Sequence, residues 1–158
     1  MNIPGWLTGY AASPRGTTEA PNLAYTPPGR WAVYCSRLRG YMDRWIVLTP
    51  WGTLRLHHIL RADIGDDPHD HPFDFASLIL CGGYTEARRF NDVDQVCRFD
   101  AGDIVRRKTT DFHRLISVDP GTWTLVLSGP KVKPWGFKMP DGSFVSHLEY
   151  RVSRTDGP

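Results

Sequence analysis

The chain has 158 residues, which suits a single domain, and a protein of this length buries about 70% of its unfolded surface, so it needs no disulfides to fold. Its formal net charge of +2 is too small to favour general nucleic-acid binding, and it has no apolar run of the roughly 18 residues that a membrane span requires. Three cysteines without a C-x-x-C pair, and a start without a charged and then apolar leader, predict a reduced, cytoplasmic protein.

The first thirty residues differ from the rest in composition. Their five prolines disfavour regular helices and sheet ladders. Trp6, Tyr10 and Tyr25 favour contact with the folded body or with a neighbouring subunit, because a free tail has little use for aromatic side chains. We therefore expect an extended Pro-rich arm over residues 1–30 and a folded β-barrel domain over residues 31–158.

Short segments that favour strands follow the arm, separated by turn residues. Residues 44–49 and 53–60 flank a Pro50-Trp51-Gly52 turn and are expected to pair as a hairpin. Only one short helix is expected, around residues 36–42. Nine or ten strands in all predict an all-β sandwich or barrel. The remaining strands are expected at residues 73–80, 84–90, 95–99, 104–105, 114–118, 122–128 and 144–150.

Three histidines form the most informative pattern in the sequence. His69 and His71 stand two residues apart, so in an extended strand they share a face and can hold one ion between them. His113, about forty residues further on, is the expected third ligand. Three neutral imidazoles suit Fe(II), Zn, Cu, Ni and Mn about equally. The alternative is a polar turn whose histidines only satisfy hydrogen bonds.

Around these histidines the sequence resembles the cupin superfamily. The second cupin motif, G-x5-P-x-G-x2-H-x3-N, is matched in spacing from Gly102 to His113, with Lys108, Thr110 and Ser117 where the proline, second glycine and asparagine usually stand. In the first motif, G-x5-H-x-H-x3or4-E-x6-G, the two histidines and the closing glycine match, Gly65 stands two residues too close, and the glutamate position falls on Phe75 or Ala76. The stretch from His69 to Glu86 and Trp135-Gly136-Phe137 also look like small cupin-like proteins of bacterial and phage genomes.

The resemblance implies a double-stranded β-helix, or jelly-roll barrel, with a divalent ion on His69, His71 and His113. The usual glutamate ligand is absent, and Asp74 is a further candidate ligand only if a bulge turns it inward. Fe(II) is favoured because three-histidine cupin sites support dioxygenases. A 2-oxoglutarate-dependent enzyme is less favoured, because it needs a carboxylate ligand such as Asp74.

Inside such a barrel, polar residues on inward strand faces are expected to contact the substrate. Arg106 is the candidate for holding a carboxylate or phosphate, and Glu86 is the candidate for proton transfer. His58 shares a face with the leucines of its strand and is expected to point inward, whereas His57 is expected on the surface. Tyr84 and Arg114 complete the candidate substrate contacts.

The function that we expect is an iron-dependent oxygenase or dioxygenase acting on a small polar molecule. One alternative is a metal-free sugar-nucleotide isomerase or epimerase, in which the basic run 106–108 binds a diphosphate. Another is a ligand-binding cupin without catalytic activity. The resemblance also implies a homodimer, which the N-terminal arm would serve. A small-molecule substrate is the only other partner expected.

Overall fold

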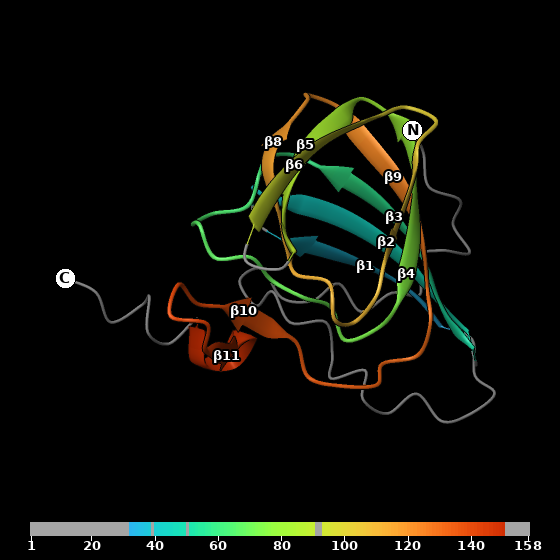
Figure 1. Ribbon diagram of the computed structural model, residues 1–158. Helices are drawn as coiled ribbons and strands as arrows, with labels where there is room; N and C mark the ends of the chain where they lie inside the picture. Colours follow the sequence, from blue (N-terminus) through green and yellow to red (C-terminus); the bar gives the residue numbers. More distant parts are fainter. Residues whose placement is uncertain (1–31, 39, 50, 91–92, 151–158) are drawn as a thin grey trace.

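The computed structural model describes residues 32–38, 40–49, 51–90 and 93–150, and the arm expected over residues 1–30 lies outside them. Within this part of the chain the structure is built from strands, as predicted, and they curl around a common interior (Figure 1). The strands are β1 (Ala32–Leu38), β2 (Met42–Thr49), β3 (Gly52–Ile59), β4 (Phe75–Cys81), β5 (Gly83–Phe90), β6 (Val93–Asp100), β7 (Ile104–Arg107), β8 (His113–Val118), β9 (Thr122–Ser128), β10 (Gly136–Lys138) and β11 (Phe144–Ser146).

Two antiparallel layers form the barrel. The larger is a six-stranded sheet in the order β1-β2-β3-β9-β4-β7. The smaller has the order β6-β5-β8, and single bridges from His69 to His113 and to Phe137 connect it to the β10-β11 pair. From β4 onward the chain crosses repeatedly between the layers, with β4, β7 and β9 in the large sheet and β5, β6 and β8 in the small one. The predicted all-β jelly roll is confirmed.

The predicted hairpin of residues 44–49 and 53–60 is confirmed, because β2 and β3 pair from Thr49 opposite Gly52 onward. The short helix predicted around residues 36–42 is wrong. That segment ends β1 and begins β2, and Leu38 pairs with Met42 across a turn in which Gly40 has φ +62°. Glycine adopts this left-handed conformation without steric cost, which lets the chain turn from β1 back into β2.

The core lies between the layers. Met42, Ile59, Ile79 and Val105 reach it from the large sheet, and Tyr84 and Leu115 from the small one. All six side chains are buried, and such burial contributes about 25 cal/mol per Å² of apolar surface. Four of these six side chains, those of Met42, Ile59, Tyr84 and Leu115, also line the cavity beside the histidines.

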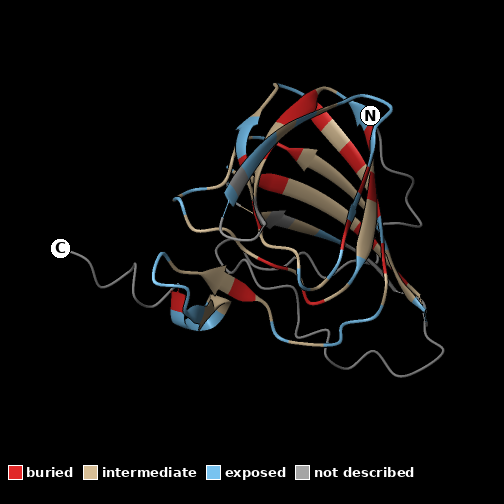
Figure 2. Cartoon of the chain, in the orientation of Figure 1, coloured by how far each residue is buried: buried red, intermediate tan, exposed pale blue. Residues whose placement is uncertain are grey.

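The large sheet is apolar on its outer face as well. Cross-strand neighbours on that face include Trp45, Leu56, Leu125 and Leu78 in one row and Val47, Leu54 and Leu127 in the next. Leu127 is 63% exposed, and along β9 buried residues alternate with residues that are at least partly exposed (Figure 2). Hydrophobicity therefore does not tell the inner face of this sheet from the outer one.

The end of the described chain departs from the strand predicted over residues 144–150. Strand β11 stops at Ser146, and residues 147–150 are helical. Ser146 and Glu149 form a capping box, in which the Ser146 amide donates to Glu149 Oε2 at 3.1 Å and the Glu149 amide donates to Ser146 Oγ at 3.4 Å. Nothing helical in the described ranges has the length and apolarity to cross a membrane.

Candidate metal centre

The segment that carries His69 and His71 is held between two strands. The His69 amide donates to the His113 carbonyl and the His113 amide donates to the His69 carbonyl, both at 2.9 Å. On its other side the Asp70 amide donates to the Gly136 carbonyl at 3.1 Å. The segment is therefore extended, so that His69 and His71 point the same way, as predicted, while Asp70 points the opposite way.

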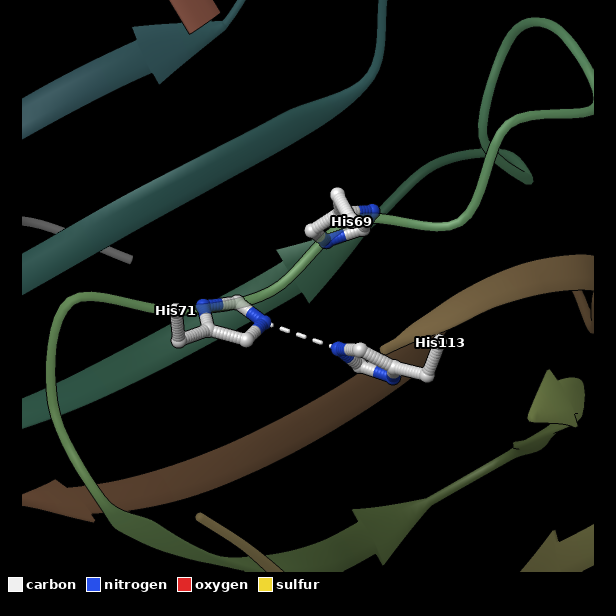
Figure 3. Close-up of side chains that lie close together, drawn as sticks. All are labelled: His69, His71 and His113. Carbon is white, nitrogen blue, oxygen red and sulfur yellow. Dashed lines mark hydrogen bonds between the residues drawn. The ribbon is translucent and has the colours of Figure 1, made fainter. Parts of the chain in front are cut away.

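The three histidines converge on one point. Their ligand atoms all lie within 4.8 Å of one another, and Nε2 of His71 is 2.8 Å from Nε2 of His113 (Figure 3). Two imidazole nitrogens bound to one ion at about 2.1 Å and a right angle are about 3 Å apart, so this pair has the spacing of adjacent ligands. No Asp, Glu or Cys of the described residues joins this group.

Glu86 contacts the ring of His113 at Nδ1. Its side chain on β5 is fully buried, and Oε2 lies 3.0 Å from His113 Nδ1. Within the described ranges neither of these two buried atoms has a hydrogen-bond partner apart from the other. A carboxylate at Nδ1 holds the proton there and leaves Nε2 free to bind an ion.

The other oxygen of Glu86 is paired with Arg107. The guanidinium donates through Nε at 3.1 Å and through a closer contact from its second nitrogen, and Arg107 is itself buried. Burial alone would raise the pKa of the Glu86 carboxyl, but His113 and Arg107 outweigh it and hold that pKa below its ordinary value. Glu86 is thus an ionised carboxylate that positions His113, and it does not line the cavity as a proton-transfer group would.

Asp63 faces Nδ1 of His69 as Glu86 faces Nδ1 of His113, but at a longer distance. Its Oδ2 lies 3.8 Å from His69 Nδ1 and accepts the Leu115 amide at 2.7 Å. Its Oδ1 accepts the Tyr41 hydroxyl at 2.6 Å. Burial, followed by the charge of Asp63, raises the pKa of Tyr41, so the hydroxyl remains a donor. The arrangement turns Nδ1 of His69 toward a carboxylate and leaves Nε2 for an ion.

His69 and His71 are neutral in the folded protein at neutral pH. Burial and then the charge of His113 lower the pKa of His69 to about 4, against the raising effect of nearby carboxylates. Burial and the neighbouring histidines lower the pKa of His71 as well. At neutral pH each of these two rings therefore keeps a nitrogen lone pair without a proton, as a metal ligand requires. The residues present fit a divalent ion.

A cavity of about 90 Å³ opens beside the three histidines. Most of its wall is apolar. Besides the three histidines, four strands contribute polar side chains: Arg55 and His57 on β3, Ser77 on β4, Tyr84 on β5 and Thr124 on β9. Of the predicted substrate contacts, Tyr84 lies in this wall. The other wall residues are Tyr41, Met42, Ile59, Phe73, Phe75, Leu115 and Val126.

The predicted orientations of His58 and His57 are wrong. His57 lines the cavity, whereas His58 lies on the outer face and stacks on Trp123 with ring centroids 4.5 Å apart. The prediction followed the leucines of β3, but these face outward: Leu54 and Leu60 are exposed. Because the side-chain period of a strand is two, choosing the wrong face reverses every residue on it.

Three more predicted positions lie away from the histidines. Arg106 is exposed, and Arg107 takes the inward place because it pairs with Phe75 across from β4. Arg114 donates to Gly65 O at 3.1 Å and to Asp66 Oδ1 at 2.6 Å, outside the cavity. Asp74 is also exposed, and its Oδ1 accepts the amide of Thr109 at 2.8 Å. No bulge turns Asp74 toward the site.

Comparison with solved structures identifies the class of fold. The hydroxypropylphosphonic acid epoxidase from S. wedmorenis superposes with a TM-score of 0.51 at 11% identity, over 66% of this chain and 65% of the epoxidase. Vicilin from Corylus avellana superposes with a TM-score of 0.53 at 10% identity, over 67% of this chain and 34% of vicilin. An RmlC-like cupin from Shewanella frigidimarina matches at 13% identity, over 63% of this chain and 86% of the cupin, with a TM-score of 0.47.

The chain spans less than two thirds of the length of the epoxidase and of vicilin. No protein-family model matches it, and no curated protein sequence matches it either. With the strand topology described above, the structural likenesses show the fold: this is a cupin fold.

Acidification is expected to destabilise the metal-free protein through its buried histidines. Burial, then Arg44 and Arg55, lower the pKa of His57 to about 3, so it stays neutral when folded while the unfolded chain protonates it near pH 6.5. Between these two pKa values the unfolded state binds more protons than the folded state does. The free energy of unfolding therefore decreases as the pH is lowered, by up to about 1.4 kcal/mol per pH unit for each such histidine. In urea unfolding at pH 7, 6 and 5, His57→Gln should flatten this slope and His58→Gln should not. Equal slopes in the natural chain and His57→Gln would refute the prediction.

Proposed function

We propose that the chain is a metal-dependent enzyme of the oxygenase type that acts on a small polar substrate. The observation that carries the proposal is the convergence of His69, His71 and His113 at the wall of a cavity, with Glu86 and Asp63 set against their outer nitrogens. Three protein ligands leave coordination positions open, and open positions distinguish catalytic from purely structural metal sites.

Fe(II) is the ion that we favour, and the three imidazoles would also accept Zn, Ni, Mn or Cu. Bound there, Fe(II) would supply dioxygen activation and polarisation of a substrate oxygen. The side chains of this protein do the rest. Phe73 and Phe75 exclude water beside His71, whose ring centroid lies 4.8 Å from that of Phe75. Burial, followed by the charge of Glu86, raises the pKa of Tyr84, so its hydroxyl stays protonated.

Oxygen uptake tests this proposal. Metal-free protein is loaded anaerobically with Fe(II) or with Zn and mixed with small polar compounds in air-saturated buffer. The Fe(II) protein should consume oxygen with a subset of the compounds, and the Zn protein and His71→Ala should not. A protein that binds Fe(II) at the histidines but consumes oxygen with none of them would instead be a ligand-binding module.

The other expected activities receive less support. A nucleotide-sugar does not fit a cavity of about 90 Å³, and in the run 106–108 Arg106 and Lys108 are exposed while Arg107 is paired with Glu86. A 2-oxoglutarate enzyme needs a carboxylate ligand, and Asp74 is exposed.

We also propose that the chain forms a homodimer through the outer face of the large sheet. This face is apolar, and such a patch is complementary to a second copy of itself, as a two-fold interface requires. Leu127 on this face and Val96 on β6 are both exposed to solvent, at 63% and 63%. By light scattering the natural chain and Val96→Asp should be dimers and Leu127→Asp a monomer. A monomeric natural chain would exclude this interface.

A further inference from the structure

The cavity has a basic side as well as a histidine cluster. Arg55 and His57 occupy successive inward positions of β3, and both line the cavity that His69, His71 and His113 border. No aspartate or glutamate of the described residues lines it. A divalent ion on the three histidines adds positive charge to the same space. The potential inside the cavity therefore favours a negatively charged occupant.

Arg55 lies close to the ion site. Its guanidinium carbon is 4.1 Å from the centroid of the Phe73 ring, and the Phe73 and His71 ring centroids are 5.9 Å apart. Phe73 therefore packs against both the Arg55 guanidinium and the ring of His71, one of the three ligand histidines. The positive charge of Arg55 is also among the causes that lower the pKa of His71, after burial and the other two histidines of the cluster. Arg55 and the three ligand histidines line the same cavity, so a small molecule bound in it can contact both.

His57 offers a second polar group at the same place. Its Nε2 is shielded from solvent and has no hydrogen-bond partner in the part of the chain that the structure describes. His57 lies opposite Arg44 on β2 and opposite Thr124 on β9. A buried imidazole nitrogen without a partner costs free energy, and a ligand oxygen would satisfy it.

The size of the cavity limits what can bind. Its volume is about 90 Å³. An engineered protein cavity of about 150 Å³ holds benzene, which has six heavy atoms. In proportion, this cavity holds about four heavy atoms, and a carboxylate with a short polar substituent is close to this size.

We propose that Arg55 and His57 form a subsite for the carboxylate of a small organic acid, which places the rest of the acid against the ion-binding histidines. A guanidinium donates two parallel hydrogen bonds to a carboxylate, a geometry that an amide or alcohol does not reproduce. The identity of the subsite is independent of the ion, but its use in catalysis rests on the proposed function. It names the substrate class: a small carboxylate with a further oxygen for the ion.

Glycolate and glycolamide test the subsite, because they differ in charge but have the same number of heavy atoms. Calorimetric titration of the natural chain, metal-free and Zn-loaded, should show at least about tenfold tighter binding of glycolate, the factor that corresponds to about 1.4 kcal/mol. Arg55→Gln should remove this preference and His57→Gln should reduce it. Arg106→Gln is the matched control: it removes the same charge from an exposed position of β7 and should leave the preference intact.

Arg55→Lys covers the case in which Arg55→Gln does not fold, since it keeps a charge and an apolar stem over Phe73 but loses the two-point contact. It should bind glycolate about tenfold more weakly than the natural chain does. No preference in the natural chain, or an unchanged preference in the Arg55 variants, overturns the subsite even if metal binds at the histidines. An Arg55-dependent preference in a protein that takes up no metal supports the subsite and overturns the proposed function.

Discussion

Asp70→Ala is expected to lower the free energy of unfolding by about 3 kcal/mol, as the loss of one partner from a buried ion pair does. Asp70 lies between His69 and His71 in the sequence, and its side chain is fully buried. Its Oδ1 accepts the Gly136 amide at 2.9 Å, and its Oδ2 pairs with Lys133. Without the carboxylate, the buried Gly136 amide has lost its acceptor. Lys133 is 33% exposed and can turn to water, which keeps the loss at the lower end of the usual range.

The same substitution should also weaken metal binding, because Asp70 fixes the segment that carries His69 and His71. The denaturation midpoint in urea measures the first effect, and competition with a chromophoric chelator measures the second. Asp74→Ala is the matched control: Asp74 is exposed, and among the described residues its carboxylate accepts one hydrogen bond, from the Thr109 amide, so its loss should cost less than about 1 kcal/mol. Equal losses in the two variants would mean that Asp70 does not anchor the site.

Glu86→Gln is expected to weaken binding of a divalent ion by about 10- to 100-fold, the usual effect of removing the group that orients a ligand histidine. The amide keeps the size of the side chain but loses the charge that holds the proton on His113 Nδ1 and balances Arg107. Zn or Co(II) affinity, measured by chelator competition on protein shown by circular dichroism to be folded, tests this. Glu149→Gln removes a carboxylate from the surface and should bind the ion as the natural chain does.

An unchanged affinity in Glu86→Gln would show that the contact with His113 Nδ1 is structural only. Glu86→Ala should have a larger effect on stability, since it leaves the buried Arg107 without its carboxylate. Comparing the two variants therefore separates the role of Glu86 at the ion from its role in the core.

The convergence of the three histidines could be predicted from the sequence because it depends on local rules. His69 and His71 share a face through strand alternation, and the spacing from Gly102 to His113 belongs to a known motif. The all-β fold could be predicted for the same reason, from short strands and the turn residues between them. Such patterns depend on residues that are close in the sequence, so they can be recognised before the packing of the strands is known.

The supporting residues could not be predicted, because they depend on which face of each strand turns inward. On β3 the leucines suggested the wrong face, since the outer surface of the large sheet is apolar too, and this misplaced His57 and His58. On β7 both faces carry an apolar residue and an arginine, so alternation could not choose Arg107 over Arg106. Asp63 is a further case, because its contacts with Leu115 and Tyr41 are made across the fold.

The metal content of the purified protein shows whether the three histidines hold an ion. The natural chain and His113→Ala would be purified without chelator from cells grown in medium balanced in iron and zinc, and their metals measured by elemental analysis. We expect about one divalent ion per natural chain, because the three ligands surround a single point, and almost none in His113→Ala. A natural chain without metal, or a variant that holds as much as the natural chain, would contradict it.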